Sequence, residues 1–315
     1  MRVFVTGGAG FIGSHTVAAL VEAGHDVTVW DDLSTGKLSN LDAVRDSVQV
    51  VAGNVRDFEP LHVAIWQARP DQVLHLAAIS SVPRSVEEPG LTHSINVEGT
   101  VNVLEAARRE RIERVVIACS AAIYGHALEV PKTEEMPAAP SSPYGLQKWQ
   151  SEQYAALYSE LYGLTTVSLR YFNVFGPRQD PKSPYSGVIS IFLDRLLNGD
   201  PVTIHGDGRQ TRDFIYVADV VDANLRALTA PLAGHHRFNI GCGRETSIRE
   251  LHDLLCEVVE RRPEPAFGPG RTGDVFRSCA DPSRALASLD FAPRYTVLEG
   301  LERLVASLRV SVPTR

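Results

Sequence analysis

The chain has 315 residues, of which 44% are hydrophobic and 22% are charged, and its formal net charge at pH 7 is −7. This composition is ordinary for a globular protein of one large domain or two smaller ones. The negative charge argues against a nucleic-acid-binding surface, and no apolar stretch approaches the length of a membrane span.

The chain opens with a predicted strand over 2–6, a glycine-rich turn over 7–13 and a helix over 11–23. The turn, GGAGFIG, contributes Gly7, Gly10 and Gly13. Glycines at a strand–turn–helix junction let backbone N–H groups approach a pyrophosphate at the helix N-terminus. The pattern favours a dinucleotide site, and the alternative is a glycine-rich turn that binds nothing.

Asp31 ends the second predicted strand, 18 positions after Gly13. A carboxylate at this place can bind the ribose hydroxyls of adenosine. Residues 31–36 include no basic side chain, so a 2′-phosphate would be repelled. The sequence therefore predicts NAD rather than NADP as the cofactor.

Strands and helices alternate through the rest of the first half. The sequence predicts further strands at 26–30, 47–51, 72–77, 114–119 and 165–170. This alternation predicts a doubly wound parallel (Rossmann) sheet of the α/β class. We expect residues 1–178 to form the NAD-binding domain and 179–315 to form mainly a smaller, interleaved α/β substrate lobe, with some segments returning to the NAD-binding domain.

Tyr144 and Lys148 stand four positions apart in a helix expected to begin after Ser142, a candidate N-cap, with Pro143 in its first turn. They share a helix face, either as a surface pair or as a catalytic couple. A tyrosine acting as a base near neutral pH needs its pKa lowered by about 3 units, or about 4 kcal/mol. One cation at ~6 Å supplies about 3 kcal/mol, so a second positive charge such as an oxidised nicotinamide is needed.

Ser120 comes just after the strand predicted over 114–119. The carboxyl ends of parallel strands form the site in such sheets, so its hydroxyl can reach the substrate oxygen that Tyr144 deprotonates. A serine in this position on its own is usually structural, and its pairing with Tyr144 and Lys148 favours the catalytic role.

The second half is richer in proline and glycine. It predicts short strands at 201–205 and 236–241 and helices near 187–198, 217–228, 247–260 and 297–309. Arg212 and Arg271 lie in glycine-rich loops, where a guanidinium can bind a diphosphate through two hydrogen bonds. The alternative for each is an exposed or structural arginine.

Seven motifs together resemble one family: TGGAGFIG, HLAA, SAAIYG, PYGLQK, LRYFNVFGPRQ, GDGRQTRDF and RTGD. They resemble the extended short-chain dehydrogenase/reductase family and, more narrowly, its NAD-dependent nucleotide-sugar 4-epimerases of the UDP-glucose and UDP-N-acetylglucosamine type. The resemblance runs from residue 1 to about 305. It implies that Ser120, Tyr144 and Lys148 are catalytic.

The resemblance also implies the binding residues. Those for NAD are Gly7, Gly10, Phe11, Ile12, Gly13, Asp31, Asp32, Ser34, Thr35, Gly36, Asn54, Val55, Leu76, Ala77, Ala78, Asn96, Tyr144, Lys148 and Phe172. Those for a UDP-sugar substrate are Ser120, Tyr144, Asn173, Gly187, Val188, His205, Arg212, Arg271, Asp274 and Ser278. The sequence departs from the family pattern at Asn54, usually acidic, at Ser190, often proline, and at Ala118 and Cys119, often serines.

The implied reaction passes through a transient 4-keto sugar. Tyr144 takes the O4 proton while hydride leaves C4 for NAD⁺, the sugar turns over about its diphosphate, and hydride returns to the other face. Alternatives are a nucleotide-sugar 4,6-dehydratase or decarboxylase of the same fold and a non-catalytic NAD-sensing protein. The first two need an acid after the catalytic serine, where this chain has Ala121 and Ala122, and the sensors commonly lack the Tyr–Lys pair.

Ser278 is the position that bears on the sugar. In the family a tyrosine here accompanies epimerases restricted to glucose and galactose, and a small residue accompanies those that also accept N-acetyl sugars. The resemblance therefore implies activity on UDP-GlcNAc and UDP-GalNAc, with UDP-Glc and UDP-Gal as additional substrates that this position does not exclude.

Four scattered cysteines without CxxC spacing indicate reduced thiols, and the histidines show no metal-ligand spacing, so no metal is expected. A strand predicted from residue 2 leaves no room for a signal peptide. We expect a cytoplasmic protein without a membrane partner. The resemblance implies a homodimer formed through the helices at about 96–110 and 144–162.

Overall fold

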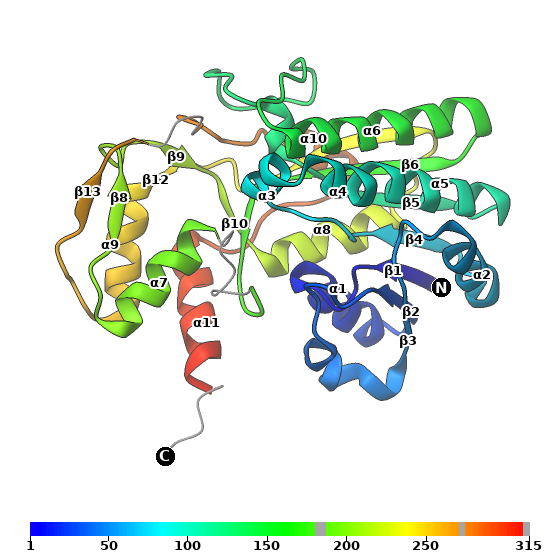
Figure 1. Ribbon diagram of the computed structural model, residues 1–315, viewed down its shortest axis with the longest axis horizontal. Helices are drawn as coiled ribbons and strands as arrows, with labels where there is room; N and C mark the ends of the chain where they lie inside the picture. The colour runs from blue at the N-terminus through cyan, green and yellow to red at the C-terminus, as the bar shows by residue number, and fades with distance from the viewer. Residues whose placement is uncertain (180–186, 271–274, 311–315) are drawn as a thin grey trace.

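A computed structural model of the protein describes residues 1–179, 187–270 and 275–310. A seven-stranded sheet lies at its centre in the order β11-β6-β5-β4-β1-β2-β3, and every neighbouring pair is parallel (Figure 1). The strands are β1 (Arg2–Thr6), β2 (Asp26–Asp31), β3 (Val48–Ala52), β4 (Gln72–His75), β5 (Arg114–Ser120), β6 (Thr165–Tyr171) and β11 (His235–Ile240). The prediction of a doubly wound parallel sheet is confirmed.

Two strands differ from their predicted bounds or surroundings. β4 ends at His75 rather than at 77, because its partner β1 ends at Thr6 and the chain turns at Gly7. The strand predicted over 236–241 is β11, which pairs with β6 at the edge of the central sheet. This part of the second half therefore returns to the sheet built by the first half.

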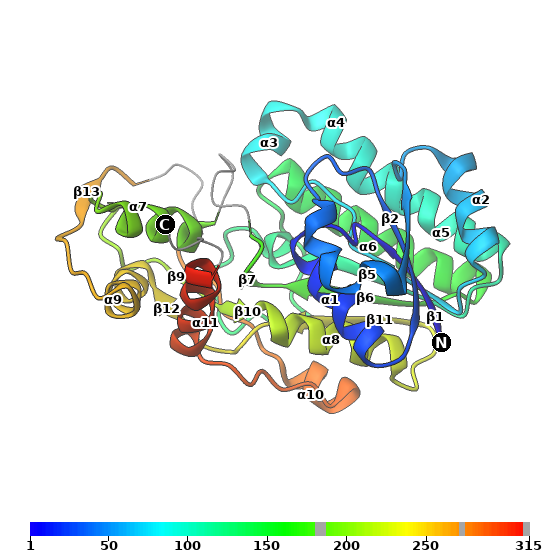
Figure 2. The same cartoon turned by 90° about the horizontal axis from the view of Figure 1, so that it is seen from below.

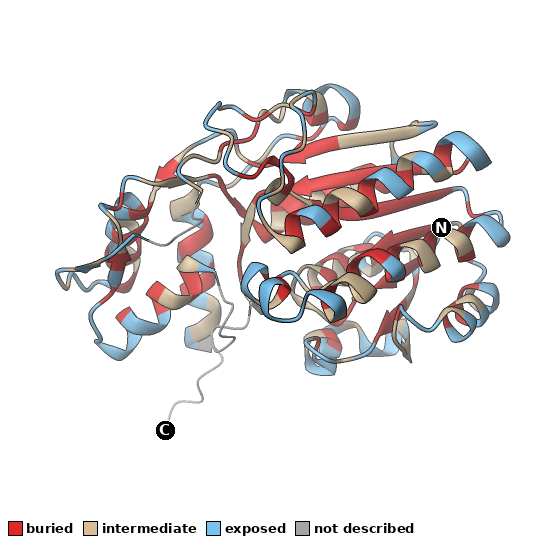
Figure 3. Cartoon of the chain, turned by 45° about the horizontal axis from the view of Figure 1, so that its top comes forward, coloured by how far each residue is buried: buried red, intermediate tan, exposed pale blue. Residues whose placement is uncertain are grey.

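Helices cover both faces of the sheet (Figures 1 and 2). One face carries α2 (Phe58–Ala68), α5 (Gly99–Arg109) and α6 (Pro143–Tyr162). The shorter α3 (Val82–Glu87), α4 (Pro89–His93) and η2 (Ser94–Glu98) come between α2 and α5 in the chain. The other carries α1 (Phe11–Glu22), α8 (Val217–Thr229) and α10 (Ser283–Leu289), with η1 (Leu38–Ser47) beside α1. Buried apolar side chains fill both layers, and the outer faces of the helices are exposed (Figure 3).

Helix α6 begins as its sequence predicts. The Ser142 side chain accepts a hydrogen bond from the Gly145 N–H at 3.1 Å, and Pro143 occupies the first turn. The helix ends at Gly163, whose φ of 72° suits a residue without a β-carbon. The 20-residue helix runs along the sheet from its first turn, which holds Tyr144.

The smaller lobe packs α7 (Val188–Asn198), α9 (Ile248–Val259) and α11 (Val297–Val310) around an apolar core of its own. Three two-stranded sheets complete the second half: β7 (Asn173–Phe175) with β10 (Phe214–Tyr216), β9 (Thr211–Arg212) with β12 (Thr246–Ser247), and β8 (Thr203–His205) with β13 (Ala266–Gly268). Within the described ranges, no helix combines the length and apolar composition needed to cross a membrane.

Candidate active site

The glycine-rich turn between β1 and α1 forms a close-packed cradle in which β-carbons would clash with neighbouring backbone. Gly7 has φ +70°, and a β-carbon there would lie 2.7 Å from the Ala77 backbone nitrogen. One at Gly13 would lie 2.0 Å from the Gly7 carbonyl oxygen. Gly10 is the N-cap of α1 and offers no capping side chain, so the first N–H groups of the helix, from Phe11 onward, remain for a ligand. This cradle fits the pyrophosphate of NAD.

Asp31 lies at the carboxyl end of β2, as predicted for a ribose ligand. Its two carboxylate oxygens accept hydrogen bonds from the backbone N–H groups of Ala9 and Leu33, each at 2.9 Å. Burial raises the pKa of this carboxyl, against the lowering effect of those two bonds. Asp31 thus ties the glycine-rich turn to the loop after β2, and each oxygen keeps a lone pair for a ribose hydroxyl.

The adenosine-side residues follow β2 and β3. The Asp32 carboxylate accepts hydrogen bonds from the Ser34 N–H at 3.0 Å and from the Asn54 side-chain amide at 2.9 Å. Thr35 and Gly36 follow in the same loop, and Gly36 packs against the Asp31 carboxylate. Val55 is only 5% exposed and packs in the apolar core with residues of α2, and its carbonyl accepts a hydrogen bond from the Asn102 side chain at 2.9 Å.

Asn96 lies in η2 and is 1% exposed. Its side-chain amide accepts a hydrogen bond from the Ile79 N–H at 2.8 Å and donates to the Ile79 carbonyl at 3.1 Å and to Gln147 Oε1 at 2.9 Å. Asn96 therefore joins the strip after β4, which contains the predicted residues Leu76, Ala77 and Ala78, to helix α6. The role of Gln147 in this link was missed from the sequence.

The structure brings Ser120, Tyr144 and Lys148 together where β5 ends. Ser120 is the last residue of β5, and its Oγ accepts a hydrogen bond from the Ala122 N–H at 3.2 Å at the start of η3 (Ala121–Tyr124). Tyr144 and Lys148 follow on one face of α6. Lys148 is 5% exposed, and its Nζ donates to the Ala118 carbonyl at 2.9 Å.

The groups of the chain alone hold Tyr144 as a neutral phenol. Burial raises the pKa of Tyr144 to about 12, although a hydrogen bond with the Ser120 side chain acts to lower it. Burial lowers the pKa of Lys148 to about 8. Burial and the Ser120 hydrogen bond, rather than Lys148, are therefore the largest influences on the Tyr144 pKa.

Phe172, predicted at the cofactor, and four predicted substrate residues lie on segments that follow β6. Phe172 packs beside Tyr124 in a small buried cluster, and the Asn173 N–H donates to the Asp213 carbonyl at 3.0 Å. Gly187 is the N-cap of α7, followed by Val188 as its first residue. His205 ends β8 and contacts the Pro269 carbonyl through Nδ1 at 3.2 Å.

The Arg212 guanidinium holds the chain segment that carries Ser278. It donates to the carbonyls of Thr211 at 2.7 Å and Val275 at 2.5 Å. Ser278 is half-buried, and hydrogen bonds hold the chain on both sides of it. The Phe276 carbonyl accepts from the Thr211 N–H at 2.9 Å, and the Ala280 N–H donates to the Asp213 carboxylate at 3.0 Å. Two further predicted substrate residues, Arg271 and Asp274, lie outside the described residues.

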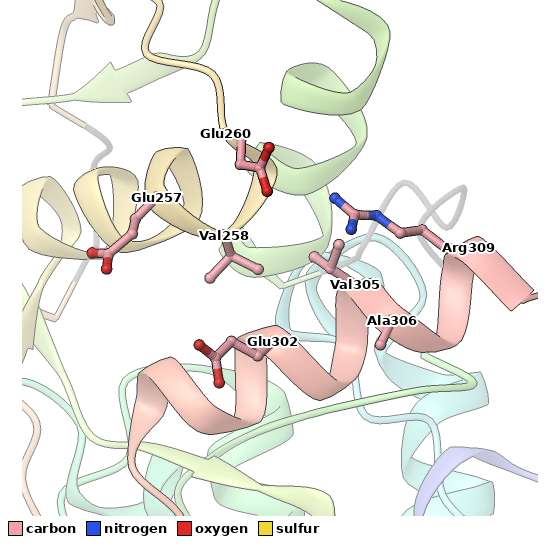
Figure 4. Close-up of a pocket in the computed structure, with 7 residues that line it drawn as sticks. All are labelled: Glu257, Val258, Glu260, Glu302, Val305, Ala306 and Arg309. Atoms are coloured by element: carbon pink, nitrogen blue, oxygen red, sulfur yellow. The ribbon is translucent and has the colours of Figure 1, made fainter.

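A hollow of about 460 Å³ lies elsewhere, between α9 and α11 (Figure 4). The carboxylates of Glu257, Glu260 and Glu302 line it, with Arg309 as the one cation among its lining residues. Three negative charges would repel a diphosphate. Among the predicted site residues that the structure describes, none borders this hollow, so we place the reaction at the strand ends instead.

Comparison with known proteins agrees with this geometry. The profile of the NAD dependent epimerase/dehydratase family matches residues 3–241. The UDP-glucose 4-epimerase of Mycolicibacterium smegmatis is 42% identical over 312 residues, which cover 98% of this chain and 99% of that protein.

Two solved structures share the whole fold. The UDP-glucose 4-epimerase of Thermotoga maritima with UDP-glucose has a TM-score of 0.94 and 40% identity, covering 99% of each chain. The UDP-N-acetylglucosamine 4-epimerase of Methanobrevibacter ruminantium, in complex with UDP-N-acetylmuramic acid, has a TM-score of 0.93 and 36% identity, also covering 99% of each chain. With its cradle fitted to a dinucleotide, the chain belongs to the NAD dependent epimerase/dehydratase family of extended short-chain dehydrogenases/reductases, and its cofactor is NAD.

Proposed function

We propose that this protein is an NAD-dependent 4-epimerase of UDP-hexoses that interconverts UDP-GlcNAc and UDP-GalNAc and has room for UDP-Glc and UDP-Gal as well. The observation that carries the proposal is the meeting of Ser120, Tyr144 and Lys148 at the carboxyl end of β5, on the same sheet edge as the dinucleotide cradle. Removing the proton of a sugar hydroxyl and returning it later requires a base that can be regenerated. The Tyr144 phenol can be that base, and the Ser120 hydroxyl and the Lys148 ammonium can assist it.

The residues of the chain have separate parts in this reaction. Tyr144 accepts the proton of the sugar O4 and later returns it, and the Ser120 hydroxyl holds the same oxygen. NAD⁺ bound in the cradle supplies the hydride acceptor and the positive charge that lowers the pKa of Tyr144. Arg212, with Arg271, holds the diphosphate, about which the 4-keto sugar turns to present its other face.

Dehydration and decarboxylation are disfavoured by the residues next to Ser120. Ala121 and Ala122 open η3 in the place where a dehydratase needs an acid to protonate a leaving hydroxyl and a decarboxylase needs a glutamate. Methyl groups cannot transfer a proton. The geometry therefore supports oxidation and reduction at C4 without loss of a group from the sugar.

Product analysis tests the proposal. Purified protein is incubated with UDP-GlcNAc or UDP-Gal, and ¹H NMR follows the anomeric and H4 signals. We expect inversion at C4 without accumulation of free NADH. A 4-keto-6-deoxy product would indicate a dehydratase, and the absence of turnover on both sugars would indicate a binding protein.

The diphosphate assignment predicts a loss of affinity in Arg212→Ala. Removing a guanidinium that makes charge-assisted hydrogen bonds should weaken UDP binding by about tenfold or more, at about 1.5–3 kcal/mol per such bond. Isothermal titration calorimetry with UDP measures this, and Arg209→Ala, in the exposed loop before β9, is the control. Unchanged UDP affinity in Arg212→Ala would place the anion site elsewhere.

We also propose that the protein is a homodimer formed through 96–110 and 144–162, which include α5 and α6. Along α6, four apolar side chains at helical spacing are 40–65% exposed: Leu146, Tyr154, Leu157 and Leu161. Helices α5 and α6 lie side by side on the outer face of the sheet (Figure 1). A row of this kind on a long helix suits a helix-pair interface.

The dimer predicts that Leu157→Glu separates the subunits, because a carboxylate buried at an apolar interface is strongly unfavourable. Light scattering after size exclusion should give twice the chain mass of 34.4 kDa for the wild type and a single chain for the variant. Leu286→Glu, at an exposed leucine of α10, is the matched control. A wild-type protein of single-chain mass would contradict the dimer.

All four cysteines are free thiols, as the sequence predicts. Free thiols persist in reducing compartments. We therefore propose a cytoplasmic location for the enzyme.

A further inference from the structure

The buried face of α6 carries two opposite charges one turn apart. Tyr144, Lys148 and Glu152 follow at intervals of four residues, and Lys148 and Glu152 are 5% and 1% exposed. Side chains at this spacing are neighbours on a helix, and attraction between unlike charges grows in an interior of low dielectric. Left to themselves, Lys148 and Glu152 would pair with each other, and the ammonium would turn away from the catalytic groups.

The structure shows a different pairing. Arg170 of β6 binds both carboxylate oxygens of Glu152, with Nε to Oε2 at 2.9 Å and Nη2 to Oε1 at 2.5 Å. Lys148 donates instead to the Ala118 carbonyl. The Cys119 thiol, paired in register with Arg170, lies within electrostatic reach of Glu152, Arg170 and Lys148 alike. The three charges therefore share one buried region, and Arg170 occupies the carboxylate.

Arg170 is itself fixed from the other side. Its Nη1 donates to the Tyr124 hydroxyl at 2.8 Å, and that hydroxyl donates to Asn239 Oδ1 at 2.7 Å. Arg170, Tyr124 and Asn239 are 3%, 1% and 0% exposed. A guanidinium held by two buried partners, Glu152 and Tyr124, keeps one orientation, which a lone arginine would not.

We propose that Arg170 is a positioning residue for the reaction: by occupying Glu152 it leaves the Lys148 ammonium directed at Ala118, Ser120 and Tyr144. The catalytic role of Lys148 in this statement rests on the proposed function. The pairing of Arg170 with Glu152 does not, because it is a contact of the structure itself. That Lys148 would take the place of Arg170 is inferred from the four-residue spacing of Lys148 and Glu152 on α6. Buried ion pairs in general contribute little to the free energy of folding. The Arg170–Glu152 pair therefore needs another explanation, and directing Lys148 supplies one.

A double-mutant design separates this role from packing. Arg170→Met keeps much of the side-chain volume and frees Glu152 to capture Lys148. We expect kcat to fall at least tenfold while KM for the UDP-sugar changes less than threefold. Arg170→Met with Glu152→Met removes both competitors, and kcat should return to within about threefold of wild type. Arg114→Met, at another buried arginine of the central sheet, is the control and should leave kcat within twofold.

A second readout does not depend on turnover. The chain has only four lysines, so protein labelled with ¹³C at lysine Cε gives few signals, and Lys148→Arg assigns the one of interest. The wild-type Lys148 signal should titrate with a pKa of about 8, as its burial implies. Pairing with Glu152 should raise that pKa above its ordinary value in Arg170→Met, and the double variant should restore the wild-type titration.

These outcomes decide the proposal separately from the proposed function. A wild type without epimerase activity would sink the function, and the lysine titration would still test the pairing. If Arg170→Met alone does not fold, the double variant decides. A double variant that folds but stays as slow as the single one, or that does not fold, overturns the proposal, since the pair would then serve folding. An unchanged Lys148 titration in Arg170→Met overturns it too.

Discussion

Tyr144→Phe should lose nearly all epimerase activity while the protein stays folded and keeps its cofactor. The change deletes one oxygen from the first turn of α6, where Tyr144 is 9% exposed and its backbone N–H is held by Ser85 Oγ at 3.0 Å. Removing a general base of this kind typically costs ~10²–10⁴-fold in rate. Steady-state kinetics on UDP-GlcNAc and UDP-Gal, with NAD extracted from the purified variant, measures both parts.

Tyr158→Phe is the matched control for this experiment. Tyr158 lies further along α6, and its hydroxyl contacts Glu105 at 3.4 Å, away from the strand ends. Its loss should leave kcat close to wild type. Near wild-type turnover in Tyr144→Phe would remove Tyr144 from the mechanism, whereas loss of bound NAD would show that the variant damages the cradle.

Ser278→Tyr should abolish activity on UDP-GlcNAc and UDP-GalNAc while sparing UDP-Glc and UDP-Gal. An acetamido group needs volume that a phenol ring would fill, and a serine hydroxyl can also donate a hydrogen bond to it. Ser278 is half-buried. Hydrogen bonds between Thr211 and Phe276 and between Asp213 and Ala280 fix the backbone on both sides of it. The added ring therefore has little freedom to withdraw by a shift of the main chain.

The measured quantity is the ratio of kcat/KM for the N-acetyl pair to that for the plain pair, in wild type and variant. In Ser278→Tyr the N-acetyl group and the added ring compete for the same volume, and overpacking of this kind typically costs about 1–3 kcal/mol. The ratio should therefore fall by about tenfold or more. Ser288→Tyr, at an exposed serine of α10, is the control. A wild-type enzyme that is inactive on UDP-GlcNAc and fast on UDP-Gal would contradict the assignment of Ser278.

Local signals in the sequence predicted the parts of the site that lie close together along the chain. The glycine turn needs only the residues from Gly7 to Gly13, and the start of α6 needs only Ser142 and Pro143. The order of strands and helices was likewise sufficient for the parallel sheet, because alternation forces crossover helices onto its faces.

Features that depend on distant segments were not predicted. Glu152 and Arg170 are 18 residues apart and meet because α6 crosses β6, which no local pattern records. Some segments of the second half were expected to return to the first domain, but no local pattern indicated that β11 would be the one to pair with β6. The hydrogen bonds that Asn96, expected at the cofactor, makes with Ile79 and Gln147 were also not predicted; they satisfy the donors and acceptor of a buried amide.

The central claim is that one carbon of the sugar loses and regains the same hydride within one active site. UDP-GlcNAc carrying deuterium at C4 is converted in ordinary water, and NMR and mass spectrometry locate the label in the UDP-GalNAc formed. We predict that the product keeps its deuterium at C4, because the hydride taken from C4 returns to C4 without exchanging with solvent. Loss of the deuterium to solvent, with hydrogen at C4 of the product, would contradict the account.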